Sequence, residues 1–258
     1  HAPEFSVTGG LFDGPVTVSL TNPFEGVIRF TTDGSEPSQS SPVFQNPLSI
    51  SSTRIIRARV FLPGMIPGPV VTHSYFINEG FDSRQLPVIS IATDPENFWD
   101  PEKGIYVQDF KPEWEVPINI EFFENDGSDR ASFNETAGTK VNGLYSWQLP
   151  QKMLGIYFRK QYGSNKLEYP LFDDRDRYSF KSFALRASGS DWSYTLFRDG
   201  MAQRLTQLNM SNDAQGFRPC IVYINGEYLG IHNIRSKVDE DFIEQNHLME
   251  PGTFDMIE

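Results

Sequence analysis

The chain contains a single cysteine in 258 residues, so no intrachain disulfide can form. That residue, Cys220, lies in the apolar run 220–224, which predicts a buried, unreactive thiol. No stretch reaches the roughly 18 apolar residues that a membrane-spanning helix needs. The sequence therefore predicts no membrane span, and its cysteine usage does not indicate a cellular compartment.

Basic residues are also scarce, because 22 Lys and Arg face 34 Asp and Glu, a formal net charge of −12. Residues 1–80 carry a net charge of −2, from four Arg and six acids, and the remaining 18 basic and 28 acidic residues carry −10. An acidic surface repels phosphate backbones and anionic lipid, so we expect no nucleic-acid partner. A bound nucleotide would need a local group of Lys and Arg to overcome this field.

The sequence does have the apolar residues for a core, with 38% hydrophobic residues and 21 Phe. Its 20 Gly and 18 Pro favour short strands and turns over long helices. Four histidines show no metal-ligand spacing. One of them, His232, lies between apolar Ile231 and Ile234 and is expected to be a packed, hydrogen-bonded histidine.

Residues 5–77 are predicted to form a small antiparallel β-sandwich. β-Branched runs separated by turn clusters predict strands at Val16–Leu20, Val27–Thr31, Ile55–Phe61 and Val70–Phe76. Alternation along the third run places Arg57 and Arg59 on one face and small apolar residues on the other.

Residues 86–258 are predicted to form an α+β domain. Expected strands are Pro87–Ile91, Gly104–Val107, Ile118–Phe123, Gly155–Phe158, Ser182–Leu185 and Pro219–Ile224, and Asn225-Gly226 predicts a hairpin turn. A helix after an N-capping Ser193 carries Asp199 in its first turns and an apolar stripe of Phe197, Met201, Leu205 and Leu208. A second helix is expected at Val238–Leu248, with Val238, Phe242 and Ile243 facing inward.

The segment Phe30–Pro37, followed by Pro42–Phe44 and Ile56–Arg59, resembles the immunoglobulin-like module at the end of chitobiases and related hexosaminidases. Its features are a tight Asp-Gly turn, a proline that stiffens the exit and a return strand rich in arginine. This resemblance implies an all-β, immunoglobulin- or fibronectin-like sandwich at residues 1–80. Sugar binding and a spacer role are both possible for it, and the spacer role is favoured because no row of exposed Trp is evident.

A longer series of motifs resembles the CotH family, named for a spore-coat protein. The motifs are Leu86–Ile91, Gly104–Val107, Gly143–Lys152, Phe158–Gly163, Tyr169–Phe172, Leu185-Arg186, Gly189–Trp192, Phe197–Asp199, Phe217–Pro219 and Ile224–Ile231. The resemblance implies a bacterial, secreted, kinase-like protein that acts outside the cell or at its surface. It assigns residues 81–258 to the N-terminal lobe of an atypical protein kinase, with ATP and a divalent metal as cofactors of the full-length protein.

Six residues are candidates for contacting a nucleotide. Lys152, in the Pro-Gln-Lys phrase of the family, is the expected phosphate-binding cation, and Asp199, or alternatively Asp191, is its expected acidic partner. Arg186 is expected to bind phosphates or to form a structural ion pair with the Asp191 carboxylate, the second being favoured. Arg198 and Arg235 complete the set, and Gly189-Ser190 would let the backbone approach a phosphate.

Two departures from the family limit this interpretation. Arg235-Ser236-Lys237 stands where relatives usually have Arg-Glu-Lys, which removes a carboxylate. The phrase Phe254–Glu258 leads in the family into the lobe that carries the catalytic and metal-binding carboxylates. We therefore expect no catalytic residue, no metal site and no retained cofactor in these 258 residues, and a secreted protein as the substrate of the parent kinase. The alternative function is a non-catalytic extracellular scaffold that binds a cell-surface or polysaccharide partner.

Overall fold

A computed structural model describes residues 1–81, 86–107, 111, 113–143, 146–175, 177–210, 212–250 and 252–256. Three parts of the sequence-based interpretation lie outside these residues. They are positions 82–85 of the expected connection, positions 144–145 of the Gly143–Lys152 motif and positions 257–258 of the last phrase.

The described chain forms two compact units, neither of which is one continuous segment. The first contains residues 1–104, 118–134 and 221–229, and the second contains residues 105–117, 135–220 and 230–258. The boundary predicted at residue 80 stays a prediction about sequence modules. No helix in the described ranges has both the length and the apolar character that crossing a bilayer requires.

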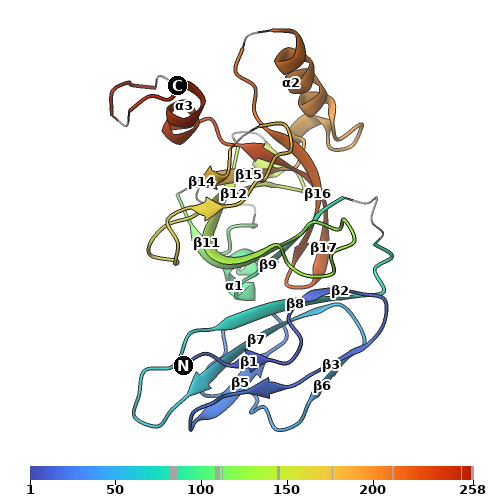
Figure 1. The fold of residues 1–258 in the computed structure, drawn as a ribbon, viewed down its shortest axis with the longest axis vertical. Helices are drawn as coiled ribbons and strands as arrows, with labels where there is room; N and C mark the ends of the chain where they lie inside the picture. Colours follow the sequence, from blue (N-terminus) through green and yellow to red (C-terminus); the bar gives the residue numbers. More distant parts are fainter. Residues whose placement is uncertain are drawn as a thin grey trace. The chain divides into compact units, whose positions relative to one another are not determined.

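The β-rich N-terminal module contains eight short strands (Figure 1). They are β1 (Glu4–Phe5), β2 (Gly10–Phe12), β3 (Val16–Val18), β4 (Leu20–Thr21), β5 (Val27–Thr31), β6 (Leu48–Ile50), β7 (Arg54–Phe61) and β8 (Val71–Ile77). All four predicted strands are confirmed within a few residues. The sheet is not wholly antiparallel, because β2 runs parallel to β8 at the edge of the four-stranded sheet β2-β8-β7-β5.

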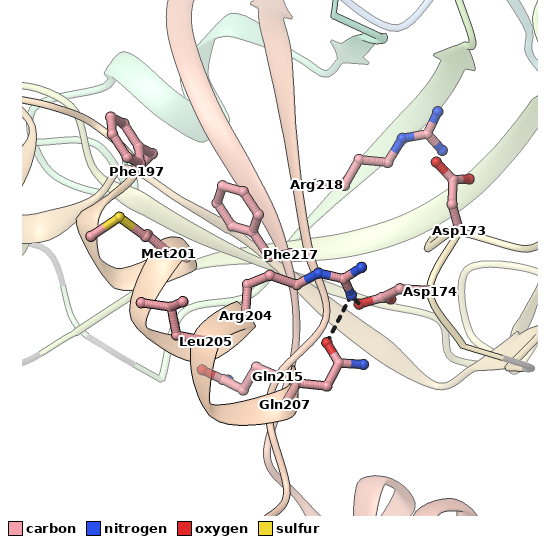
Figure 2. Close-up of a pocket in the computed structure, with 11 residues that line it drawn as sticks. Asp173, Asp174, Phe197, Met201, Arg204, Leu205, Gln207, Gln215, Phe217 and Arg218 are labelled. Atoms are coloured by element: carbon pink, nitrogen blue, oxygen red, sulfur yellow. Dashed lines mark hydrogen bonds and ion pairs between the residues drawn. The ribbon is translucent and has the colours of Figure 1, made fainter. Parts of the chain in front are cut away.

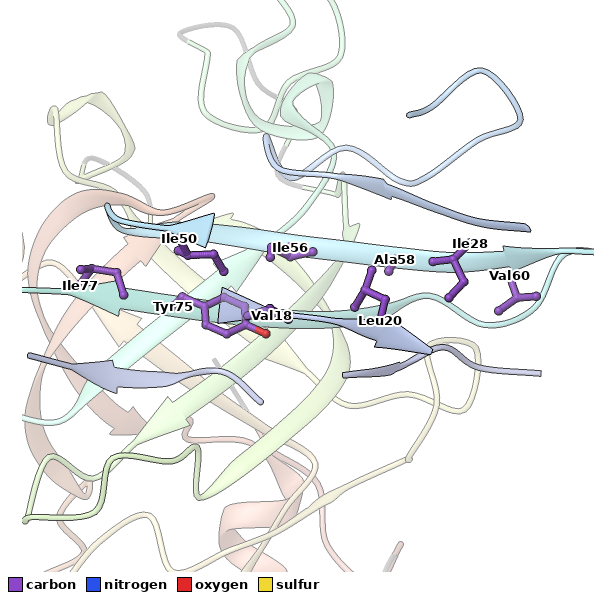
Figure 3. Packing of buried hydrophobic residues seen from close by; sticks show 9 residues of the cluster. All are labelled: Val18, Leu20, Ile28, Ile50, Ile56, Ala58, Val60, Tyr75 and Ile77. Carbon is purple, nitrogen blue, oxygen red and sulfur yellow. The ribbon is translucent and has the colours of Figure 1, made fainter. Parts of the chain in front are cut away.

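The core of this module lies between the four-stranded sheet and the short ladders β3-β6 and β1-β4 (Figure 3). Along β7, Ala58 and Val60 are buried while Arg57 and Arg59 are partly exposed, which confirms the predicted alternation. The arginines bind main-chain oxygens of loops: Arg57 donates to Gly34 O at 2.7 Å and Arg59 to Gly68 O at 2.5 Å. These arginines thus hold the loops of the module in place.

Seven further strands form one closed sheet in the order β10-β11-β12-β15-β17-β16-β9. Their bounds are β9 (Val88–Ala92), β10 (Val116–Phe123), β11 (Phe133–Asn142), β12 (Met153–Tyr157), β15 (Ser182–Arg186), β16 (Phe217–Ile224) and β17 (Glu227–Ser236). The expected α+β lobe is thus not confirmed, since the described chain is mostly β and this sheet closes into a barrel. The Asn225-Gly226 hairpin connects β16 to β17 as predicted, with positive φ at both residues.

The remaining elements are short (Figure 1). They are α1 (Pro95–Trp99), the 3₁₀ turns η1 (Ser146–Gln148) and η2 (Gly189–Asp191), the paired strands β13 (Leu167–Glu168) and β14 (Ser179–Phe180), α2 (Arg198–Asn209) and α3 (Glu240–His247). The strand predicted at Gly104–Val107 is wrong: Gly104 N donates to Asp100 O at 2.8 Å and closes a turn after α1. Strand β11 was not predicted, because its polar sequence hides the buried side chains of Thr139 and Val141.

Helix α2 begins later than expected and is packed differently. Its N-cap is Phe197 rather than Ser193, with no side-chain capping bond, although Asp199 does lie in the first turn. The predicted apolar stripe is half-exposed, at 51% for Phe197, 47% for Met201, 53% for Leu205 and 65% for Leu208. Of the twelve residues of α2, all described, only the small Gly200 is buried. The helix therefore rests on the molecule through a narrow contact.

Helix α3 is confirmed, and Asp239 caps it by accepting from Phe242 N at 3.1 Å. Phe242 is buried as predicted, whereas Val238 lies before the helix and is exposed. The helix is fixed by a buried ion pair in which Arg177 donates to Asp241 at 2.7 Å.

Candidate functional site

The register of strands β12, β15 and β17 decides which candidate side chains can meet. Leu154 lies opposite Leu185, and Leu185 lies opposite Ile234. Residues that lie directly opposite each other on neighbouring strands point to the same face of a sheet, so these three buried leucine and isoleucine residues share one face. Successive side chains of one strand point to opposite faces. Arg186 and Arg235, each one residue further along its strand, share the other face.

Helix α2 presents Asp199 to this arginine face. The carboxylate Oδ2 lies 3.2 Å from Arg235 Nη1 and 3.4 Å from Arg186 Nε. Neither contact has hydrogen-bond geometry, since both nitrogen atoms lack a hydrogen-bond partner within the described ranges. One carboxylate therefore faces two guanidinium groups at ion-pair distance. The structural ion pair favoured for Arg186 is present, but its partner is Asp199 rather than Asp191.

Arg235 is the most buried cation of the group, with 1% of its surface exposed. Its Nη2 donates to Gln215 Oε1 at 3.1 Å, and its guanidinium lies 5.6 Å from the centre of the Phe217 ring. Burial lowers the pKa of Arg235, and the nearby Asp199 carboxylate opposes that shift. Nε and Nη1 remain without hydrogen-bond partners in the part of the chain that is described. Sequence reasoning missed Gln215 and Phe217, because no local pattern links them to Arg235.

A small cavity of about 200 Å³ opens beside Arg186. Its walls are Ser146, Met153, Arg186, Ala187, Gly189 and Ser190. Ser188 and Gly189 both have positive φ, at 60° and 54°, so the chain turns sharply at the start of η2. The Gly189-Ser190 segment therefore lies next to the Arg186 side chain, as the expectation of a backbone approach to an anion requires.

The two other candidates, Asp191 and Arg198, form a separate pair that organises the start of α2. Asp191 accepts from Thr195 Oγ1 at 2.5 Å and from Arg198 N at 3.2 Å, and Arg198 Nη2 lies 3.3 Å from its other oxygen. The Thr195 hydrogen bond is the main cause that lowers the pKa of Asp191. The Asp191 carboxylate thus holds the loop before α2, and it does not face Arg235.

Lys152 does not join these residues. It precedes Leu154 by two positions, so the strand period places it on the leucine face, away from Arg186 and Arg235. No carboxylate in the described ranges lies within ion-pair distance of its Nζ, and Asp199 is paired with the arginines instead. The expected Lys152–Asp199 pair is therefore wrong, because Asp199 pairs with the two arginines while the Lys152 ammonium is bound to main-chain oxygens of Trp147 and Leu149.

The surroundings of Lys152 are uncharged and include two aromatic side chains, Tyr106 and Trp147. Its Nζ donates to the main-chain oxygens of Trp147 and Leu149, the second at 3.3 Å, and lies 5.4 Å from the Tyr106 ring centre. Burial lowers the pKa of Lys152. These residues line a second cavity of about 490 Å³. The Lys152 ammonium already donates to two main-chain oxygens of the preceding loop, so its role is to stabilise that loop.

A third cavity, of about 390 Å³, follows the apolar side of α2 (Figure 2). Phe197, Met201 and Leu205, from the N-cap and the helix, lie on one side of the group of lining residues, and Phe217 from β16 lies beside them. Arg204 reaches across to Asp174 at 2.7 Å. The predicted apolar stripe therefore lines a groove instead of filling a core.

The described residues around Arg186 and Arg235 fit an anion better than a metal. Among the described residues, no group of three or more His, Cys, Asp or Glu could hold a metal ion. Ser236, at the position where the family resemblance implies a Glu, is buried and accepts from Gly216 N at 3.0 Å. Its hydroxyl has thus become part of the packing. The two arginines, by contrast, offer N–H groups to a negatively charged group.

Two family models match the chain. Residues 7–72 match the chitobiase/beta-hexosaminidase C-terminal domain, and residues 139–254 match the CotH kinase protein family. A search of curated proteins found no match. The chain thus carries a CotH kinase-like domain after a β-rich module, and both sequence resemblances are confirmed. The arginine face, Asp199 and the cavity beside Arg186 all lie within the segment that matches the CotH kinase family.

Proposed function

We propose that the CotH-like region binds the phosphate groups of a nucleotide through Arg186 and Arg235, as the N-terminal lobe of a kinase-like protein. The observation that carries this proposal is the burial of Arg235 with Nε and Nη1 lacking hydrogen-bond partners in the described chain. Buried charged groups are normally paired and hydrogen-bonded. A phosphate oxygen is an acceptor that would satisfy these N–H groups.

Charge balance supports the same conclusion. Arg186 and Arg235 contribute two positive charges, and Asp199 contributes one negative charge at ion-pair distance. The site therefore keeps an excess positive charge inside a chain whose net charge is −12. This is the local cationic group that a nucleotide needs in an acidic protein. Phosphoryl-transfer enzymes likewise place cations on the phosphates and pair them with an acidic residue from a packed helix.

ATP is the nucleotide that the family suggests, and a divalent metal would normally accompany it. The described residues do not fit a metal ion, so we assign no step to one. We propose binding and orientation of the phosphates by this region, with no catalytic residue among the candidates. Secretion, a bacterial source and action on an extracellular protein follow from the family resemblance alone and belong to the same proposal.

The test is a titration of the 258-residue protein with a fluorescent ATP analogue. The Arg186→Gln variant is expected to weaken binding about tenfold, because one charge-assisted contact to phosphate is lost. The matched control is Arg198→Gln, which removes the same charge from an exposed side chain on α2. Equal affinities for the two variants would contradict the assignment of Arg186.

A third variant, Lys152→Met, distinguishes nucleotide binding at the two arginines from binding in the cavity around Lys152. Because Lys152 lies on the leucine face and is bound to main-chain oxygens, its loss is expected to leave the ATP affinity unchanged while the melting temperature falls. Loss of binding in Lys152→Met, with Arg186→Gln unaffected, would transfer the site to the cavity lined by Tyr106 and Trp147. Absence of ATP binding by the unmodified protein would refute the proposed function.

A further inference from the structure

The β-rich module makes extensive contacts with residues that come later in the chain, all within the first compact unit. Ser74 on β8 and Ser90 on β9 are each 1% exposed, and their hydroxyl oxygens lie 2.7 Å apart. Arg130 donates to Thr8 O at 2.7 Å, and Leu11 N donates to the main-chain oxygen of Asp129 at 2.8 Å. Main-chain and buried side-chain bonds therefore connect the module to β9 and to the loop after β10.

The second group of contacts surrounds a buried carboxylate on β10. Glu121 is 0% exposed, and its Oε1 lies 3.4 Å from His73 Nδ1 on β8. Asn134 Nδ2 donates both to Glu121 Oε1 at 3.1 Å and to Thr72 O at 2.8 Å, so it bridges the two strands. A carboxylate in this position would regain water if β8 moved away. Its burial beside His73 and Asn134 thus holds β8 close to β10.

Two glycine turns also meet. The Asp33-Gly34 turn of the module lies against Asn225, since a Cβ at Gly34 would come within 2.2 Å of Asn225 Oδ1. The same Oδ1 accepts from Thr93 N at 2.9 Å. On the other side of the hairpin turn, a Cβ at Gly226 would lie 3.2 Å from Arg54 Cα. The absence of a side chain at each glycine therefore permits the close approach.

Aromatic packing completes the contact. Phe76 on β8 packs edge-on against Phe123 on β10 and Tyr223 on β16, with ring centres 5.5 Å and 4.8 Å away. Tyr223 donates through its hydroxyl to Glu79 Oε2 at 3.1 Å. These residues belong to a buried cluster that contains side chains from both parts of the sequence. An apolar cluster of this kind resembles a core more than a surface between mobile modules.

We infer that the β-rich module is a fixed structural component whose binding partner is this chain itself, namely β9, β10 and the β16–β17 hairpin. The module uses β8 and the Asp33-Gly34 turn for this contact, so these surfaces are not free to bind a polysaccharide. It also does not act as a spacer that moves independently. Unfolding of the module must then expose Ser90, Glu121 and Tyr223, and must loosen the strands that carry them.

Hydrogen exchange measured by mass spectrometry on the full chain tests this inference. Gly34→Ala is compared with Gly64→Ala, because both glycines have positive φ, at 90° and 71°, but a Cβ at Gly64 would have no neighbour within 4 Å. Both variants strain a turn of the module, and only Gly34→Ala also collides with Asn225. Exchange in peptides covering residues 88–93 and 221–229 is expected to accelerate about tenfold in Gly34→Ala and to stay unchanged in Gly64→Ala.

A second pair of variants tests the contact without backbone strain. Asn134→Ala removes the bridge between Thr72 and Glu121 and is expected to accelerate exchange in β8 and β10 together. Asn142→Ala, which removes a hydrogen bond to Tyr157 on the neighbouring strand of β11, is expected to leave β8 unchanged. Unaltered exchange of residues 88–93 and 221–229 in Gly34→Ala, together with β8 unaffected by Asn134→Ala, would overturn the inference.

Discussion

Asp199 Oδ2 lies 3.2 Å from Arg235 Nη1, so a partly exposed helix carboxylate faces the most buried guanidinium of the site. The contact lacks hydrogen-bond geometry, and the same oxygen also faces Arg186. Asp199 therefore neutralises part of the arginine charge without satisfying its N–H groups. An incoming phosphate would meet the same arginines and would be repelled by the carboxylate at this short distance.

This relationship predicts that Asp199→Asn binds ATP more tightly than the unmodified protein. The substitution keeps the side-chain shape and removes a negative charge next to the proposed phosphate position, so an increase of several-fold in affinity is expected at low salt. Titration with a fluorescent ATP analogue at two ionic strengths measures it, and the gain should shrink as salt screens the charge. A loss of affinity would instead mean that Asp199 orients the arginines for binding.

The control for this prediction is Asp191→Asn on the preceding turn. Asp191 accepts hydrogen bonds from Thr195 Oγ1 and Arg198 N and does not face Arg235. Loss of its charge is therefore expected to lower the melting temperature and to change ATP affinity little. Equal gains in the two variants would show a general effect of net charge rather than a local one.

The sequence predicted the residue types of this site but not their arrangement. Five of the six candidates lie in or next to the arginine cluster and the start of α2, because the family motifs that carry them fold together. The prediction of a Lys152–Asp199 pair was wrong because the direction in which a side chain points depends on strand register. A shift of one residue turns the side chain to the other face of the sheet. Strand β12 begins at Met153, and nothing in the local sequence shows that Lys152 shares a face with Leu154.

Helix α2 shows a second limit of sequence reasoning. The spacing of Phe197, Met201, Leu205 and Leu208 does describe one side of a helix, as predicted. Periodicity reports that these side chains share a side, but it does not report what covers that side. In the structure this side lines a groove (Figure 2), and the helix is anchored through Gly200 instead. A buried glycine leaves no signal in a hydrophobic pattern.

Gly200→Ala is consequently expected to destabilise the protein, although alanine favours helices over glycine by about 1 kcal/mol. A Cβ at this position would come within 2.1 Å of the Phe217 ring, which itself packs over Arg235. Overpacking of this kind costs about 1–3 kcal/mol, which exceeds the gain in helix propensity. Chemical denaturation measures the change, and a stabilised variant would show that α2 can move away from β16 without cost.

The anchor of α3 supplies a third prediction. Asp241 and Arg177 form a buried pair at 2.7 Å, with 8% and 7% of their side chains exposed. Asp241→Ala leaves the guanidinium buried without its carboxylate and is expected to cost about 3 kcal/mol. Glu240→Ala removes the same charge from the exposed neighbouring position and should cost less than about 0.5 kcal/mol. Similar costs in denaturant titrations of the two variants would contradict the importance of the buried pair.

The last prediction concerns pH and depends on His232, which was expected to be a packed histidine and is 0% exposed. Its Nδ1 lies 3.0 Å from Gln151 Nε2 and its Nε2 lies 3.2 Å from Lys152 O, which suits a neutral ring that accepts at Nδ1 and donates at Nε2. Burial lowers the pKa of His232 from 6.5 to about 4. The folded protein therefore resists protonation at a site that the unfolded chain protonates readily.

Between pH 6.5 and about 4 the unfolded chain binds a proton at His232 that the folded chain does not bind, so the free energy of unfolding must fall as the pH falls through this window. The full shift corresponds to about 3 kcal/mol, lost by pH 4. Denaturant titrations of the unmodified protein and of His232→Gln measure this loss, and the variant should show a shallower decline. His247→Gln, at a half-exposed position on α3, should keep the steep profile. If His232→Gln declined as steeply as the unmodified protein, other groups would cause the acid sensitivity and the ring at position 232 would titrate normally.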